Sequence, residues 1–103
     1  MGPSLSTHVL DTGTGRPAVG VGVTVYRGDE LVASGTTDAD GRIRDLAPGR
    51  LARGTYRLVF DVAGYLDDAF FRRVALDVEL GADGHHHVPL LVSRNGLVSY
   101  RGS

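Results

Sequence analysis

Short runs in which apolar and polar residues alternate dominate this chain, and they predict β-strands. In the clearest runs, at 21–26, 56–62 and 74–80, every second residue is apolar. A period of two turns one row of side chains toward a core and the other row toward solvent. In chain order the predicted strands are 5–11, 21–26, 31–36, 42–45, 56–62, 74–80, 86–93 and 97–101.

The segments between these runs are typical of tight turns. Most of the 15 glycines fall in short polar clusters such as Asp38-Ala39-Asp40-Gly41 and Asn95-Gly96, where glycine allows a positive φ. About eight short strands joined by such turns predict an all-β, two-sheet sandwich. One segment, 65–73, has apolar residues at helical spacing with acids before bases, which predicts one short helix there.

Composition narrows the class of protein. A chain of 103 residues forms a single domain over 1–103, with residues 1–4 as a loose N-terminus. A core of this size gives a lone subunit marginal stability, which favours oligomerisation. The absence of cysteine excludes disulfides and a cysteine nucleophile. A net charge of −1 gives no basic surface for nucleic acid, and no apolar run is long enough for a membrane span or a signal core, so we expect a cytoplasmic protein.

His87, on the predicted strand 86–93, is the most informative histidine of the chain. Alternate residues from Val88 onward form the core face of this strand, so His87, Pro89 and Leu91 share the opposite face. A lone sandwich would expose that face to solvent, and we expect a second subunit to cover it. Half-sheltered at such an interface, His87 would titrate near working pH. A purely structural hydrogen bond across the interface explains its position equally well.

Three other positions are candidates for chemistry. His8 lies inside the first predicted strand, and Arg42 follows the turn at 37–41. Alone, His8 would be a structural or surface histidine, and Arg42 a solvated residue paired with a nearby aspartate. The chain ends on Tyr100-Arg101-Gly102-Ser103, an aromatic ring, a planar cation, a glycine and a hydroxyl. Termini are ordinarily loose and polar, so this ending is expected to line a pocket.

Together these segments resemble the 5-hydroxyisourate hydrolases of the transthyretin-related family. The resemblance rests on motifs in the order of that family: Ser6-Thr7-His8-Val9-Leu10-Asp11, Thr14-Gly15-Arg16-Pro17-Ala18, Thr37-Asp38-Ala39-Asp40-Gly41-Arg42, His87-Val88-Pro89-Leu90-Leu91 and Tyr100-Arg101-Gly102-Ser103. The chain departs from the family at His85-His86-His87, where His-Tyr-His is usual, and at Arg94-Asn95-Gly96-Leu97, before the last strand.

The resemblance implies a transthyretin-like sandwich, a homotetramer with active sites at a subunit interface, and hydrolysis of the small molecule 5-hydroxyisourate in urate catabolism. It implies catalytic roles for His8, Arg42, His87 and Ser103, and substrate binding by Tyr100, Arg101 and Gly102, without metal or cofactor. In that reaction a histidine would activate water against a ring amide, and an arginine would stabilise the resulting oxyanion.

Three other interpretations compete with this one. His85 and His87 point the same way from a strand and, with His8, would suit a hydrolytic metal site. A transthyretin-like carrier would bind an aromatic ligand in an intersubunit channel without turnover, and a structural adhesion module would have no site. Metal analysis of purified protein, together with the loss of hydroxyisourate absorbance, separates these interpretations.

Overall fold

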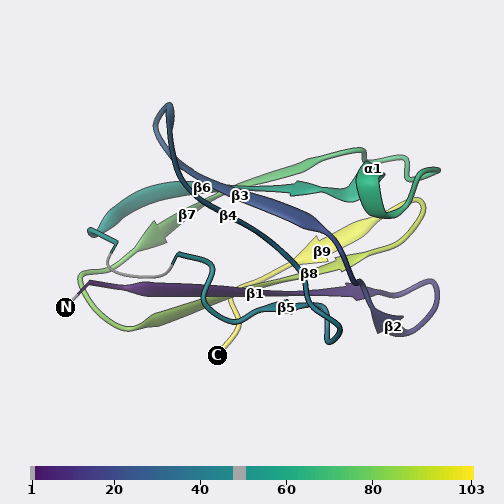
Figure 1. Cartoon of the computed structure of the whole chain (residues 1–103), viewed down its shortest axis with the longest axis horizontal. Coiled ribbons are helices and arrows are strands. Elements are labelled where there is room, and N and C mark those ends of the chain that lie inside the picture. Colours follow the sequence, from purple (N-terminus) through teal and green to yellow (C-terminus); the bar gives the residue numbers. More distant parts are fainter. Residues whose placement is uncertain (1, 48–50) are drawn as a thin grey trace.

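The computed structural model describes residues 2–47 and 51–103 as two β-sheets packed face to face (Figure 1). The elements are β1 (Ser4–Asp11), β2 (Arg16–Pro17), β3 (Gly22–Arg27), β4 (Glu30–Thr36), β5 (Arg42–Ile43), β6 (Gly54–Asp61), α1 (Val62–Tyr65), β7 (Val74–Leu80), β8 (His85–Val92) and β9 (Leu97–Ser99). One sheet has the strand order β4-β3-β6-β7. The other has the order β2-β1-β8-β9, with β5 also paired to β1. The predicted two-sheet sandwich is confirmed.

The strand prediction differs from the structure mainly at short strands and strand ends. The described residues form nine strands, because β2 is a two-residue strand with exposed side chains and no alternating pattern. The last strand ends at Ser99 and not at residue 101. β1 begins at Ser4, so Ser4 belongs to the sheet and not to a loose N-terminus. Met1 lies outside the described residues.

The predicted helix at 65–73 is wrong in position. The helical turn α1 comes earlier, directly after β6, where the Asp61 side chain accepts a hydrogen bond from the backbone N–H of Gly64. This is the usual way in which an aspartate caps a helix start. The hydroxyl of Tyr65 donates to Oδ2 of Asp11 at 2.8 Å, which ties α1 to the end of β1.

The helical spacing of apolar residues at 65–73 was misleading, because these side chains do not form one buried face. Phe70 is 71% exposed, although Ala69 beside it is buried. The segment is held by polar contacts, since Nη1 of Arg72 donates to the carbonyls of Asp67 and Ala69. These residues therefore form a chain of turns and not a helix.

The core lies between the sheets and confirms the predicted inward faces. On β6, Tyr56, Leu58 and Phe60 are at most 2% exposed. On β8, Leu90 and Val92 face them from the other sheet with similar burial. The alternate residues of β8 therefore lie on the outer face of its sheet.

Two strands far apart in sequence lie side by side in the middle of the second sheet. β1 and β8 run parallel, with Ser6 opposite His87 and His8 opposite Pro89 (Figure 1). The other edge of β1 is shared by β2 and β5, and β5 sets Arg42 opposite His8. This arrangement collects the polar residues of three strands on one outer face.

In the part of the chain that the structure describes, no helix has the length and apolar character needed to cross a membrane.

Candidate active site

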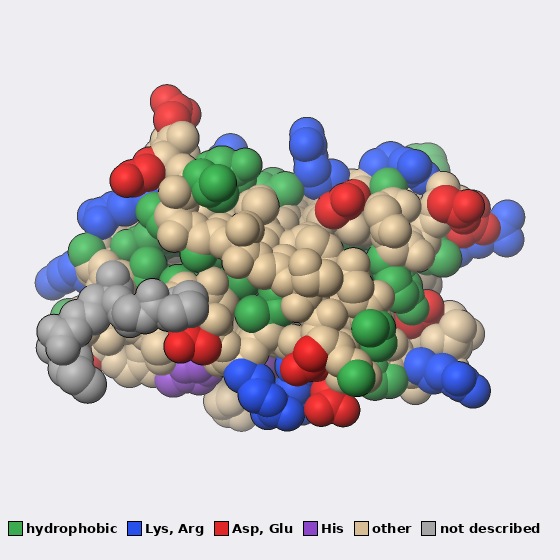
Figure 2. Space-filling view, viewed as in Figure 1, with side chains coloured by type: hydrophobic (Ala, Val, Ile, Leu, Met, Phe, Trp, Pro, Cys, Tyr) green, Lys and Arg blue, Asp and Glu red, His purple; other side chains and the backbone are tan. Residues whose placement is uncertain are grey.

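The candidate site lies on the outer face of the sheet that contains β1, β8 and β5. Because side chains alternate along a strand, Ser6 and His8 of β1 share this face with His85 and His87 of β8. Histidine side chains reach the surface beside arginines at the lower edge of the molecule in Figure 2. The site therefore depends on the register of two strands at opposite ends of the sequence.

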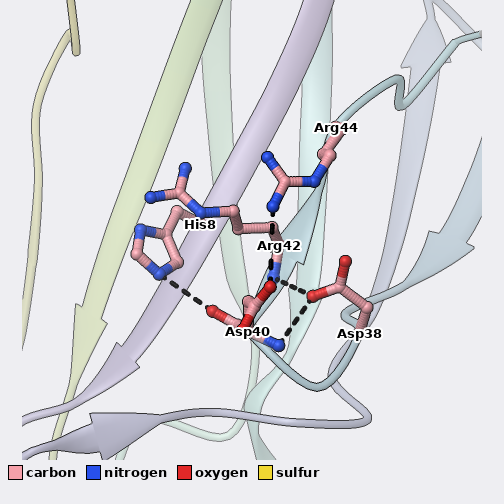
Figure 3. A network of polar contacts seen from close by, with 5 residues as sticks. All are labelled: His8, Asp38, Asp40, Arg42 and Arg44. Carbon is pink, nitrogen blue, oxygen red and sulfur yellow. Dashed lines mark hydrogen bonds and ion pairs between the residues drawn. The ribbon is translucent and has the colours of Figure 1, made fainter.

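A tight turn before β5 places Arg42. The carboxylate of Asp38 accepts hydrogen bonds from the backbone N–H groups of Asp40 and Arg42, at 2.9 and 3.0 Å (Figure 3). The bond from Arg42 is the larger cause, and that from Asp40 the next, of a lowered pKa at the Asp38 carboxyl. Gly41 has a φ of 74°, and a Cβ there would lie 2.5 Å from the carbonyl oxygen of Val9. Glycine thus lets the turn lie close against β1.

His8 lies beside Arg42 in this arrangement (Figure 3). Its Nε2 is 3.0 Å from the carbonyl oxygen of Asp40, and because a carbonyl only accepts, Nε2 carries a proton. Asp40 also forms an ion pair with Arg44 at 3.5 Å, but both side chains are about 70% exposed, so the pair adds little stability. The turn therefore fixes the orientation of the His8 ring.

The site alters the protonation of His87. Its Nδ1 is 2.7 Å from Oγ of Ser6, and the residue is partly buried. Burial is the largest cause that lowers the pKa of His87, followed by the charges of Arg42, His8 and His85. Because its pKa lies below the ordinary value of 6.5, His87 is neutral at neutral pH and carries a basic lone pair.

The C-terminal segment is joined to His87 by its backbone. Gly102 pairs with His87 as an isolated antiparallel bridge, and its N–H donates to the carbonyl of His87 at 2.8 Å. A Cβ on Gly102 would lie 2.5 Å from Cδ2 of the His87 ring. The last residues are thus held against the imidazole, where only glycine fits without displacement.

A depression of about 490 Å³ opens over these groups. Five predicted site residues line it, namely Arg42, His87, Tyr100, Gly102 and Ser103. His8 is not part of its lining, although it neighbours Arg42. Arg101 lines a separate depression of about 350 Å³, beside 76–80 of β7. The roles predicted for all seven residues remain predictions.

Four residues that line the depression were not predicted as catalytic or substrate-binding residues: Ser6, Thr7, Arg44 and His85. Ser6 precedes His8 by two positions, and His85 precedes His87 by two, so the period of two already placed each pair on one face. The parallel register that brings the two pairs together leaves no local signal in the sequence. Within the described ranges, no group of three or more metal-binding side chains is placed to hold a metal ion.

Comparison with known proteins gives near full-length similarity. A model of the HIUase/Transthyretin family matches residues 5–102. The chain is 44% identical to the 5-hydroxyisourate hydrolase of Caulobacter vibrioides, over 96% of this chain and 97% of that protein. Among solved structures, the 5-hydroxyisourate hydrolase of Klebsiella pneumoniae has a TM-score of 0.92 and 37% identity over the full length of both chains. Sea bream transthyretin in complex with thyroxine has a TM-score of 0.86 and 25% identity over 96% of this chain and 94% of that one.

Proposed function

The chain belongs to the HIUase/transthyretin family, and we propose that it hydrolyses 5-hydroxyisourate to 2-oxo-4-hydroxy-4-carboxy-5-ureidoimidazoline in urate catabolism. The similarity to hydrolases covers nearly the whole chain. The observation that carries the proposal is that His87, whose pKa is lowered chiefly by burial, and Arg42 line the same depression. A base and a fixed cation at one opening can activate water and stabilise an oxyanion, the two steps that assist amide hydrolysis.

In the proposed reaction His87 is the general base. Water gives a proton to the lone pair of the imidazole while its oxygen attacks a ring carbonyl of the substrate. The carbon–nitrogen bond then breaks as the protonated His87 gives its proton to the leaving nitrogen. The product carries a ureido group and a carboxyl group, which loses its proton to solvent. A positioned base of this kind contributes a factor of ~10²–10⁴ in rate.

We propose that Arg42 stabilises the negative charge that develops on the carbonyl oxygen of the substrate. As water adds, the carbonyl oxygen becomes anionic, and a guanidinium that is already in place stabilises it without reorganisation. The Asp38 turn supplies this placement, because it binds the backbone N–H of Arg42 itself. His8 stands beside Arg42 with its Nε2 proton held by the turn, and it is the third proposed catalytic group.

The C-terminal residues supply the other side of the proposed site. Tyr100, Gly102 and Ser103 line the same depression as His87. The backbone bridge at Gly102 fixes their distance from the imidazole. We assign substrate binding to Tyr100 and Gly102 and a catalytic hydrogen-bonding role to Ser103, with Arg101 at the rim of the neighbouring depression.

We also propose that the protein is a homotetramer, a pair of dimers with active sites at a subunit interface. Support comes from the outer face of the β8–β9 pair, where Leu91 lies opposite Val98. Val98 is 57% exposed and Tyr100 is 56% exposed, next to the depression. Light scattering should give about 44 kDa for four chains of 10.9 kDa, because a standard interface holds at micromolar concentration. A value near 11 kDa would contradict the assembly.

The test of the function is the decay of freshly prepared hydroxyisourate, followed by its absorbance with and without the protein. Wild type should accelerate the decay. The variants His8→Ala, Arg42→Ala and His87→Ala should each lower kcat/KM by a factor of ~10² or more while the oligomer stays folded. The alternative is a transthyretin-like carrier, for which the substrate would bind without any acceleration of its decay.

A further inference from the structure

A row of hydrogen bonds joins four side chains on the outer face of the second sheet. Oγ of Ser4 is 2.6 Å from Nδ1 of His85, and Nε2 of His85 is 2.7 Å from Oγ of Ser6. The same Ser6 oxygen is 2.7 Å from Nδ1 of His87. The row crosses between β1 and β8 at every step, because their parallel register sets Ser4 opposite His85 and Ser6 opposite His87.

Ser6 couples the protonation of the two imidazoles. A hydroxyl has a single proton, so Ser6 donates to one ring nitrogen and must accept from the other. If Ser6 donates to His85, then His87 carries its proton on Nδ1 and has a free lone pair on Nε2. If Ser6 donates to His87, the proton of that ring is on Nε2, which then cannot act as a base. Ser6 is only 6% exposed, so solvent competes little for these two bonds.

We propose that Ser6 and His85 are positioning residues that hold His87 protonated on Nδ1, so that Nε2 is free to accept the proton of the attacking water. The proposal rests on the proposed function, because a reaction with His87 as its base requires this arrangement. Each bond of the row then has one direction: His87 donates to Ser6, Ser6 donates to His85, and His85 donates to Ser4.

The row also suits the charged state of His87 that follows proton transfer. When Nε2 takes the proton of water, both ring nitrogens carry hydrogen, and Ser6 continues to accept from Nδ1 without moving any other proton. The titratable and charged groups around His87 are His8 from β1, Arg42 from β5, Arg44 just after β5, His85 from β8, and Tyr100 and the terminal group of Ser103. Burial of the ring and the charge of Arg42 favour neutral His87, which returns His87 to its basic form after each turnover.

The direct test is nitrogen-15 NMR of histidine-labelled protein at neutral pH, with the His87→Gln variant used to assign the signals. We expect the His87 proton on Nδ1 in wild type. The His85→Ala variant removes the acceptor of the Ser6 hydroxyl, so the hydroxyl can turn to His87 and a second population with the proton on Nε2 should appear. A wild-type His87 with its proton on Nε2, or no change in His85→Ala, would overturn the proposal.

Kinetics provide an independent readout. Ser6→Ala should lower kcat by a factor of ~10 to ~10², with KM changed less than about twofold, because the hydroxyl orients the base and both of its hydrogen bonds are made to imidazoles. Ser6→Thr keeps the hydroxyl and should restore most of kcat. The matched control is Thr12→Val. This change removes the hydrogen bond that the Thr12 hydroxyl, just after β1, donates to the carbonyl of Val92 on β8, away from the histidines. A wild-type kcat in Ser6→Ala, or a loss that Ser6→Thr does not restore, would refute the role.

His85→Ala keeps the kinetic test decisive if Ser6→Ala does not fold, because His85 is exposed and its loss leaves the core intact. Its kcat should fall as the second NMR population appears, and His85→Gln should recover it by offering an acceptor to Ser6. An unchanged kcat in His85→Ala would count against the proposal. Failure of wild type to accelerate hydroxyisourate decay would refute the proposed function, whereas the NMR result would still decide the state of His87.

Discussion

The contact between Gly102 and His87 allows one methyl group to test how the site is built. In Gly102→Ala the new Cβ would lie 2.5 Å from Cδ2, 3.2 Å from Cγ and 3.3 Å from Cβ of His87. Carbon atoms in favourable contact are about 3.5–4.0 Å apart. The ring or the terminal segment must therefore move by about 1 Å or more.

That displacement sets the expected magnitude. Misplacing a catalytic group by about 1 Å can cost ~10²-fold in rate, so kcat/KM of Gly102→Ala should fall by about that factor. The fold should change little, because the clash is at a chain end that can move outward. We expect a loss in the free energy of unfolding below ~1 kcal/mol, less than overpacking costs in a closed core.

The assay is hydroxyisourate decay, together with a denaturant titration of the same preparation. Gly96→Ala is the matched control, since Gly96 lies in the same terminal region and a Cβ there meets only Oγ of Ser93 at 3.7 Å, an ordinary contact. The control should keep its rate within about twofold. If Gly102→Ala were fully active, the close approach of the terminus to the imidazole would have no part in the chemistry.

Three further results are expected. Deleting Arg101-Gly102-Ser103 should abolish activity and lower the free energy of unfolding by ~1–2 kcal/mol at most. A tag after Ser103 should lower turnover, whereas the same tag before the first residue should not. Full activity with the C-terminal tag would contradict this. Asp38→Ala should lower kcat/KM roughly tenfold by freeing the backbone of Arg42, whereas Asp38→Asn keeps a side-chain acceptor and should lose less; equal rates would argue against the turn as a support. The lowered pKa of His87 predicts that kcat/KM is maintained as pH falls through 6.5 and declines only as pH nears the lowered pKa. The unfolded chain binds the proton first, so stability is full above about 6.5 and falls as pH drops toward the lowered pKa; a decline in rate centred above 6.5 would contradict this.

The two-sheet sandwich could be predicted from the sequence, because the alternation of apolar and polar residues along a strand is a local property. The run 74–80 was predicted with the bounds that β7 has, and the inward residues of β6 are buried as expected. The helix at 65–73 failed for a related reason. Helical spacing was present there, but Phe70 is exposed and the capping contact of Asp61 starts a helical turn earlier. Spacing predicts a helix only when a core receives the apolar stripe.

The site was predictable only in part. Histidine positions and the motif before Arg42 indicated a face and a turn, and the structure brings Arg42, His87 and the terminal residues to one depression. The Ser6 contacts depend on which strands pair and in which register. Such pairing is set by the whole fold, since a shift of one residue would turn Ser6 away from His87. No local pattern of residues contains that information.

The parallel pairing of β1 with β8 has a consequence for how the protein is made. Ser6 contacts His87 across a separation of 81 residues. The edge of β1 that pairs with β8 therefore stays unpaired until almost all of the remaining chain has been synthesised. Closing so long a loop costs entropy that only later contacts repay, and folding dominated by such contacts is slow. In the meantime the backbone N–H and C=O groups along this edge of β1 are unpaired, and such strand edges make incompletely folded chains prone to aggregation. Substitutions that weaken β8 should therefore reduce the yield of folded protein during expression even where the finished protein tolerates them.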